Sequence, residues 1–102
     1  VAVQDLDFTY FYPKVCQVFP NESYGLYVYF NDGSVRFYDV RHLLNKDTVF
    51  EPLQDINVFK STLTILNDTV AWDLKGNRDE RDCIDIDPLV LFEAPIVEDP
   101  LI

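Results

Sequence analysis

Two stretches of the sequence alternate apolar and polar side chains on both sides of a short turn signal, and this pattern predicts two β-hairpins. The first covers residues 26–40 around Asp32-Gly33, and the second covers residues 63–72 around Asn67-Asp68. Because a shift of one residue would exchange the two faces of a strand, the alternation also specifies how the strands of each hairpin pair. The chain is therefore expected to form an antiparallel sheet.

A type I′ turn centred on Asp32 and Gly33 would set the register of the first hairpin. In that register Phe30 pairs with Val35, and Leu26 pairs with Asp39 at the end of the hairpin. One face then carries the expected core side chains Leu26, Val28, Phe30, Val35 and Phe37. The outward face carries the candidate partner-binding residues Tyr27, Tyr29, Arg36 and Tyr38.

The second hairpin follows the same logic around its own turn. With Asn67-Asp68 at the turn, Ile65 pairs with Val70 and Leu63 pairs with Trp72. These four side chains are expected to complete the core, which Leu43 and Phe59 close from the helical side.

Short helices are expected around the two hairpins. Asp55 is a candidate N-cap for a helix that carries Phe59, and Asp87-Pro88 combines an N-cap with a proline at the first helical position. Short strands are expected at residues 15–19 and 83–86, and a helical turn at 41–46. The pattern is typical of an α+β fold: an antiparallel β-sheet of two hairpins plus flanking short strands, with two or three short helices on one face.

The chain of 102 residues has the length of one domain. We divide it into an aromatic-rich N-terminal segment (residues 1–12), a single α+β domain (13–93) and an acidic C-terminal tail (94–102). The longest unbroken apolar run has five residues, whereas a membrane-spanning helix needs about 20. We therefore expect no membrane association.

The net charge of −10 is unevenly distributed along the chain. Residues 79–102 hold eight acidic residues against the single Arg81, a net charge of −7, and residues 1–78 have a net charge of −3. A surface of this sign repels phosphate backbones, so we expect no direct binding of nucleic acid. Two cysteines outside any CxxC motif indicate reduced thiols and a cytoplasmic protein.

Several short motifs occur in a characteristic order: YPKV, LYVYFNDGSVRFYDV, FEPLQDINVF, VAW and DIDPLVLFE. In this order they resemble a family of small bacterial proteins known as domain of unknown function 2442. The loop 73–83 is longer than is usual in that family, and Phe92 stands where the family has Tyr. The positions that match the family pattern are Phe30, Gly33, Asp39, Val40, Phe50, Leu53, Asp55, Phe59, Trp72, Asp85, Ile86, Pro88, Leu91 and Phe92.

The resemblance implies a cytoplasmic bacterial protein with a small α+β fold and no established catalytic residues. Members of the family are often encoded beside another small protein, in arrangements read as toxin–antitoxin-like pairs. The resemblance therefore favours a regulatory partner rather than a substrate.

Few residues are suited to catalysis or metal binding. The single histidine, His42, follows Asp39 closely, and no sequence signature links it to a cysteine or serine nucleophile. The acidic residues of 79–87 do not have the spacing of an EF-hand calcium loop. We expect no cofactor and no metal site, and we interpret Asp39 as the N-cap of the turn at Arg41-His42.

Three functions are compatible with these features. The favoured one is a non-catalytic interaction module, one half of a toxin–antitoxin-like pair, with no enzymatic activity. The first alternative is a small enzyme that uses Asp39, His42 and Asp85, and the second is an adaptor of a nucleic-acid-binding complex. For the outward aromatic face we expect cover by a second copy in a homodimer or by a partner protein; cover by residues 8–12 is the alternative.

Overall fold

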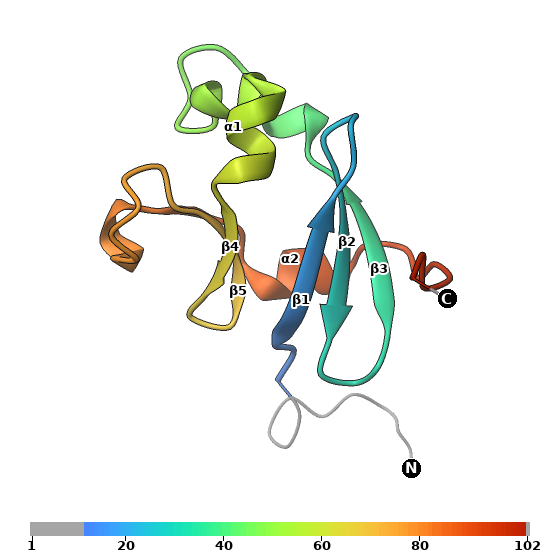
Figure 1. Cartoon of the computed structure of the whole chain (residues 1–102). Coiled ribbons are helices and arrows are strands. Elements are labelled where there is room, and N and C mark those ends of the chain that lie inside the picture. The colour runs from blue at the N-terminus through green and yellow to red at the C-terminus, as the bar shows by residue number, and fades with distance from the viewer. Residues whose placement is uncertain (1–11, 102) are drawn as a thin grey trace.

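The computed structural model describes residues 12–101 and contains two three-stranded antiparallel sheets (Figure 1). The first sheet has the order β1 (Val15–Pro20), β2 (Gly25–Phe30) and β3 (Val35–Asp39). The second has the order β4 (Leu63–Leu66), β5 (Thr69–Trp72) and β6 (Ile84–Asp85). The α+β class is confirmed, and the two hairpins belong to two separate sheets.

Five short helical segments connect and cover the strands. They are the 3₁₀ helices η1 (Arg41–Leu43), η2 (Glu51–Gln54) and η3 (Glu80–Asp82) and the α-helices α1 (Ile56–Ser61) and α2 (Pro88–Phe92). The expected N-caps at Asp55 and Asp87 are confirmed, because the side chain of Asp55 accepts a hydrogen bond from the Asn57 amide and that of Asp87 from the Leu89 amide. Within the described part of the chain, no helix is long and apolar enough to cross a membrane.

The predicted register of the first hairpin is wrong by one residue. Val28 pairs with Arg36 and Tyr29 with Val35, because three residues rather than two form the loop. The Phe30 amide donates to the Ser34 carbonyl, and Gly33 takes a left-handed conformation with φ +88°. A turn followed by a left-handed glycine is the usual form of a three-residue hairpin loop.

The new register changes which side chains face the core. Residues paired directly across an antiparallel ladder lie on the same face. Arg36 and Tyr38 therefore share the core face with Val28 and Leu26, whereas Phe37 lies opposite Tyr27 on the other face. The expected outward position of Arg36 and Tyr38 is incorrect, and so is the expected core-face position of Phe37 and Val35. Val35, opposite Tyr29, is nevertheless buried.

The predicted register of the second hairpin is confirmed. Ile65 pairs with Val70 and Leu63 with Trp72, and both turn residues, Asn67 and Asp68, have positive φ angles. All four residues of β5 are buried, since this strand lies between β4 and β6. The core cluster joins both sheets and contains Val15, Leu26, Val28, Phe30, Val40, Leu53, Phe59, Val70, Trp72, Ile86 and Leu91.

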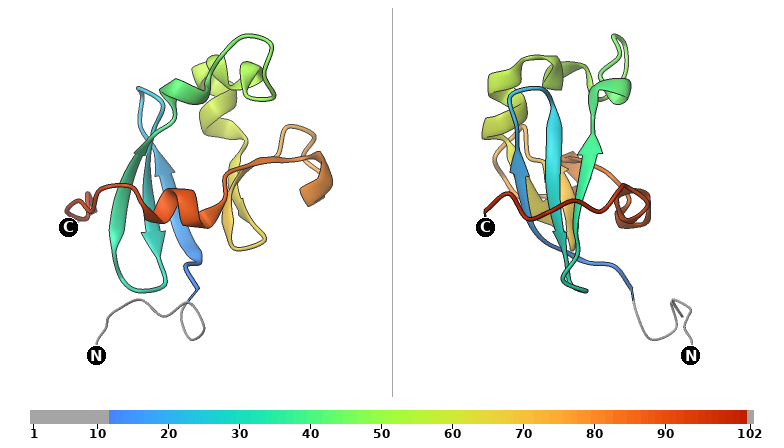
Figure 2. Two further views of the ribbon diagram at one scale, coloured as in Figure 1. Left: turned by 180° about the vertical axis from the view of Figure 1, so that it is seen from behind. Right: turned by 90° about the vertical axis from the view of Figure 1, so that its right-hand side faces the viewer.

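Helix α2 covers the core face of the first sheet and lies behind it in Figure 1. The Phe92 ring packs edge-to-face against Phe30 at 5.0 Å, and the Arg36 guanidinium lies 4.0 Å above the Phe92 ring centroid. The chain then runs along the free edge of β3, where the Phe37 amide donates to the Pro95 carbonyl and the Val97 amide donates to the Val35 carbonyl. Figure 2 shows this C-terminal segment passing the edge of β3 toward the opposite face of the sheet.

Candidate protein-binding surface

The face of the first sheet opposite α2 carries four aromatic rings, which we call the outer aromatic cluster. Its members come from all three strands, and each is half-buried: Phe19, Tyr27, Tyr29 and Phe37. Phe19 contacts Tyr29 edge-to-face at 5.7 Å, and Tyr27 contacts Phe37 at 5.2 Å. Of the residues expected on the outward face, Tyr27 and Tyr29 lie there, and Phe19 and Phe37 complete the set.

Gly25 leaves room for the ring of Phe37 beside its backbone. A Cβ atom at Gly25 would lie 2.4 Å from Cζ of Phe37 and 2.7 Å from Nδ2 of Asn21, distances that real Cβ contacts do not reach. Glycine at a strand position often marks such a close approach. The position of the Phe37 ring, and with it one side of the outer aromatic cluster, therefore depends on this glycine.

The C-terminal segment covers the other side of the cluster. The Tyr29 hydroxyl donates a 2.5 Å hydrogen bond to the Asp99 carboxylate. Partial burial, together with this hydrogen bond and the negative charge of Asp99, raises the pKa of Tyr29 to about 12. The side chains of Ile96 and Leu101 nevertheless remain 65% and 63% exposed.

A hollow of about 420 Å³ adjoins the cluster at the edge of β3, and we call it the β3-edge hollow. Phe37 and Tyr38 line it on the strand side, and Val90, Ala94 and Pro95 line it on the side of α2. The hollow exists because the C-terminal segment pairs with β3 only as far as Phe37. The preceding residues bond back to α2 instead, since the Glu93 amide donates to the Val90 carbonyl and the Ala94 amide to the Leu91 carbonyl.

The polar groups of the β3-edge hollow are Asp39, His42 and Glu93. Asp39 accepts three side-chain hydrogen bonds from Arg41, including one of 2.7 Å, and another from the Arg41 amide. The guanidinium and amide of Arg41 hold the pKa of Asp39 below its ordinary value. The expectation that Asp39 is the N-cap of this turn is incorrect, because Val40 occupies the N-cap position of η1. Asp39 precedes the cap and binds the first helical residue, Arg41, instead.

His42 and Asp85 occupy different sites. The His42 Nε2 atom lies 3.3 Å from the Tyr38 hydroxyl, and burial raises the pKa of Tyr38. Asp85 instead lines two other hollows, one with Asp68 and Asp87 and one with Cys83. The three residues of the enzymatic alternative therefore do not line a common hollow, since only Asp39 and His42 share the one at β3.

Three further positions of the family pattern, Gly33, Trp72 and Pro88, have structural roles. Gly33 forms the left-handed residue of the first hairpin loop. Trp72 is fully buried and donates from Nε1 to the Phe59 carbonyl at 3.1 Å. Pro88 occupies the first turn of α2.

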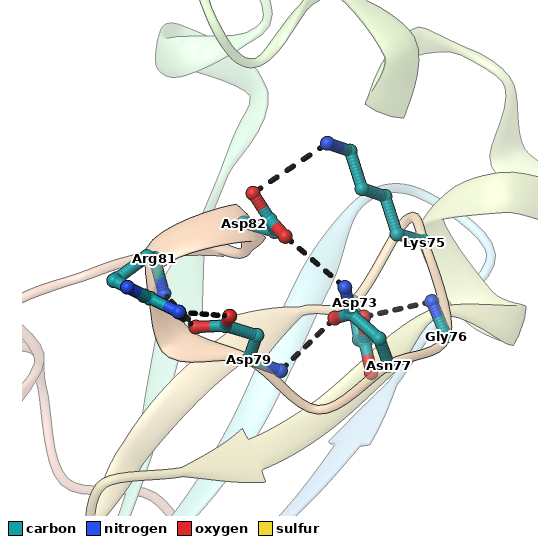
Figure 3. A network of polar contacts seen from close by, with 7 residues as sticks. All are labelled: Asp73, Lys75, Gly76, Asn77, Asp79, Arg81 and Asp82. Carbon is teal, nitrogen blue, oxygen red and sulfur yellow. Dashed lines mark hydrogen bonds and ion pairs between the residues drawn. The ribbon is translucent and has the colours of Figure 1, made fainter.

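The loop between β5 and β6 is stabilised by its own polar side chains (Figure 3). Asp73 accepts hydrogen bonds from the amides of Gly76 and Arg78, both at 2.8 Å. Although partial burial acts to raise it, these bonds hold the pKa of Asp73 below its ordinary value. Asp82 accepts hydrogen bonds from the side chains of Lys75 and Asn77. Among the described residues, no group of three or more His, Cys, Asp or Glu side chains is placed to hold a metal ion.

Two further residues of this surface, Glu93 and Asp99, were not predicted from the sequence. Asp99 accepts a hydrogen bond from Tyr29, 70 residues earlier in the chain, and Glu93 lines the β3-edge hollow. The proposed alternative cover by residues 8–12 lies almost entirely outside the described residues, because the description begins at Tyr12.

Comparison with known proteins agrees with the resemblance noted in the sequence. The family model described as "Protein of unknown function (DUF2442)" matches residues 15–95. Neither the curated proteins nor the solved structures gave a match. The matched region runs from the first residue of β1 to Pro95, where the chain joins the edge of β3, and thus includes both sheets and both α-helices. The chain belongs to the DUF2442 family of proteins of unknown function.

Proposed function

We propose that this protein is a non-catalytic interaction module that binds another protein through the outer aromatic cluster. The proposal rests on a set of four half-buried aromatic rings on the sheet face opposite the core. Interface cores are enriched in Tyr, Phe and Trp and depleted in Lys and Glu, and the cluster has this composition. The exposed apolar side chains of Val90 and Ile96 extend the surface around the edge of β3.

The partner we propose is a different, basic protein rather than a second copy of the chain. Two copies would each bring a charge of −10 to the interface, and the acidic C-terminal segment lies beside the cluster. Like charges oppose association, whereas a basic partner would be attracted from a distance. In a bacterial cytoplasm this arrangement fits one half of a toxin–antitoxin-like pair, and the partner would be the product of the adjacent gene.

Sedimentation velocity tests this proposal directly. The purified chain is run alone and then mixed with the product of the adjacent gene. We expect a monomer alone and a complex of the two proteins in the mixture, and we expect Tyr27→Ser to weaken the complex. Tyr12→Ser is the matched control, because Tyr12 is 49% exposed but lines a hollow formed by the second hairpin turn.

Two outcomes would change the assignment. A parent protein that sediments as a dimer, and that Tyr27→Ser converts to a monomer, would replace the partner with a second copy. If Tyr27→Ser and Tyr12→Ser weaken the complex equally, the outer aromatic cluster is not part of the interface.

The enzymatic alternative has less support. Asp39 is held in an ion pair with Arg41, and Asp85 lies in other hollows. The adaptor alternative requires a second, basic protein to contact nucleic acid, so it is a special case of the partner proposed above.

A further inference from the structure

The β3-edge hollow combines apolar walls with an available negative charge. Glu93 is exposed, and its carboxylate forms no ion pair with any residue that the structure describes. Asp39 lies on the opposite side of the hollow, with its charge shared with Arg41. An occupant that brings a positive charge would therefore meet at least one unpaired carboxylate.

The walls of the hollow fit the aliphatic part of such an occupant. Val90 is 44% exposed, and with Ala94 and Pro95 it forms an apolar side opposite Phe37 and Tyr38. Long cationic side chains bury their methylene groups against apolar surface and keep the charged end near water or a carboxylate. Aromatic rings near the charge add a cation–π attraction.

The edge of β3 also offers a backbone position beside the hollow. The amides of alternate residues point to the same side of a strand, so the Asp39 amide lies on the same edge as the Phe37 amide, which donates to Pro95. The C-terminal segment does not reach Asp39, because its pairing with β3 is a single bridge between Arg36 and Ile96. A peptide backbone can therefore approach at Asp39 while its side chain enters the hollow.

From these observations we propose that the β3-edge hollow is a subsite for a lysine or arginine side chain of the basic partner. This inference rests on the proposed function, and Phe37 connects the two surfaces because it belongs to both. The cluster would contact the apolar part of the partner, and Glu93 would pair with the cation at the edge.

The test is a titration of the protein alone with small probes, and the readout is the chemical shifts of the backbone amides in NMR spectra. The cationic probe is N-acetyl-lysine methylamide, and the control probe is N-acetyl-norleucine methylamide, which has the stem without the ammonium group. We expect the lysine probe to shift the amides of Tyr38, Asp39 and Val90 with a dissociation constant of about 1 mM or weaker, as befits one side chain. The norleucine probe should shift them less at equal concentration.

A pair of charge variants sharpens the result. Glu93→Gln should weaken the lysine probe about two- to fivefold, the range expected of one exposed ion pair. Glu98→Gln removes the same charge from the C-terminal segment outside the hollow and should leave the affinity at the parental value. Equal shifts with both probes, or equal weakening by both variants, would overturn the proposal.

These outcomes are independent of the proposed function, because no partner is present in the titration. If the lysine probe fails while the partner still binds in a Tyr27-dependent manner, the hollow is not a cation subsite and the interaction module stands. If the probe binds but no complex with the adjacent gene product forms, the subsite stands and the assigned partner is wrong.

Discussion

The two hairpins share an alternating pattern of apolar side chains but have different surroundings. In the second hairpin, β5 is buried along its whole length, and Trp72 on this strand is at the centre of the core. In the first hairpin only one face reaches the core, and the other carries the outer aromatic cluster. The aromatic residue of the second hairpin, Trp72, is therefore part of the core, whereas the four rings on the outer face of the first sheet lie outside the core cluster.

The largest expected effect is at the core of the second hairpin. Trp72→Ala removes a fully buried indole that packs on Phe59 at 5.6 Å and donates to the Phe59 carbonyl. A large-to-small change of this kind lowers the free energy of unfolding by about 3–5 kcal/mol. Urea denaturation measures it, and a loss under about 1 kcal/mol would contradict the central position of this strand.

A smaller effect on stability is expected at Gly25, which lies beside the Phe37 ring of the outer aromatic cluster. Gly25→Ala places a methyl group against the Phe37 ring and should lower the free energy of unfolding by about 1–3 kcal/mol, as overpacking does. The double variant Gly25→Ala with Phe37→Leu should recover part of the loss. If the losses in free energy of unfolding caused by Gly25→Ala and Phe37→Leu simply add in urea denaturation, the close contact between these two residues does not limit stability.

Removing glycine from the first hairpin turn should lower stability, whereas introducing glycine into the second turn should raise it. Gly33→Ala puts a side chain at φ +88° in open space and should cost about 1 kcal/mol from backbone conformation alone. Asp68→Gly relieves a non-glycine residue at φ +65° and should stabilise the second hairpin by about 0.5–1 kcal/mol. Thermal unfolding of both variants checks the signs, and stabilisation by Gly33→Ala would contradict the three-residue loop.

The smallest effect concerns the C-terminal segment over the cluster. The Tyr29 pKa of about 12 exceeds its ordinary value of 10.0, so the folded state retains this proton longer than the unfolded state does. The associated stability is fully present below pH 10.0 and is lost as the pH rises through about 12. Ultraviolet titration should show a tyrosine that titrates near pH 12, which Tyr29→Phe removes and Asp99→Asn shifts to lower pH. Tyr38, whose pKa is also raised, remains in both variants. An unchanged titration in Asp99→Asn would place Asp99 away from Tyr29.

The register of the second hairpin could be predicted from sequence, and that of the first could not. Around Asn67-Asp68 the alternation has one apolar face, so only one pairing buries it. Residues 26–30 and 35–39 carry aromatic or aliphatic side chains on both faces, and two pairings are compatible with the pattern. The choice depends on Asp32, whose side chain accepts bonds from the amide and hydroxyl of Ser34 and shapes a three-residue loop.

The remaining features of the surface depend on long-range contacts. Nothing in the local sequence around Ile96 or Asp99 predicts pairing with β3 or a bond to Tyr29, because the partners are about 60–70 residues away. The helix caps at Asp55 and Asp87 were predictable because a cap is a contact between residues close in sequence.

The most direct test of the division between the two hairpins measures stability and binding in one variant. Tyr27→Ser removes a half-buried ring from the outer aromatic cluster and leaves the core face unchanged. We predict a loss of less than about 1.5 kcal/mol in the free energy of unfolding and at least about tenfold weaker calorimetric binding of the adjacent gene product. A variant that loses several kcal/mol of stability and binds the partner with parental affinity would show that the cluster serves the fold and not the interface.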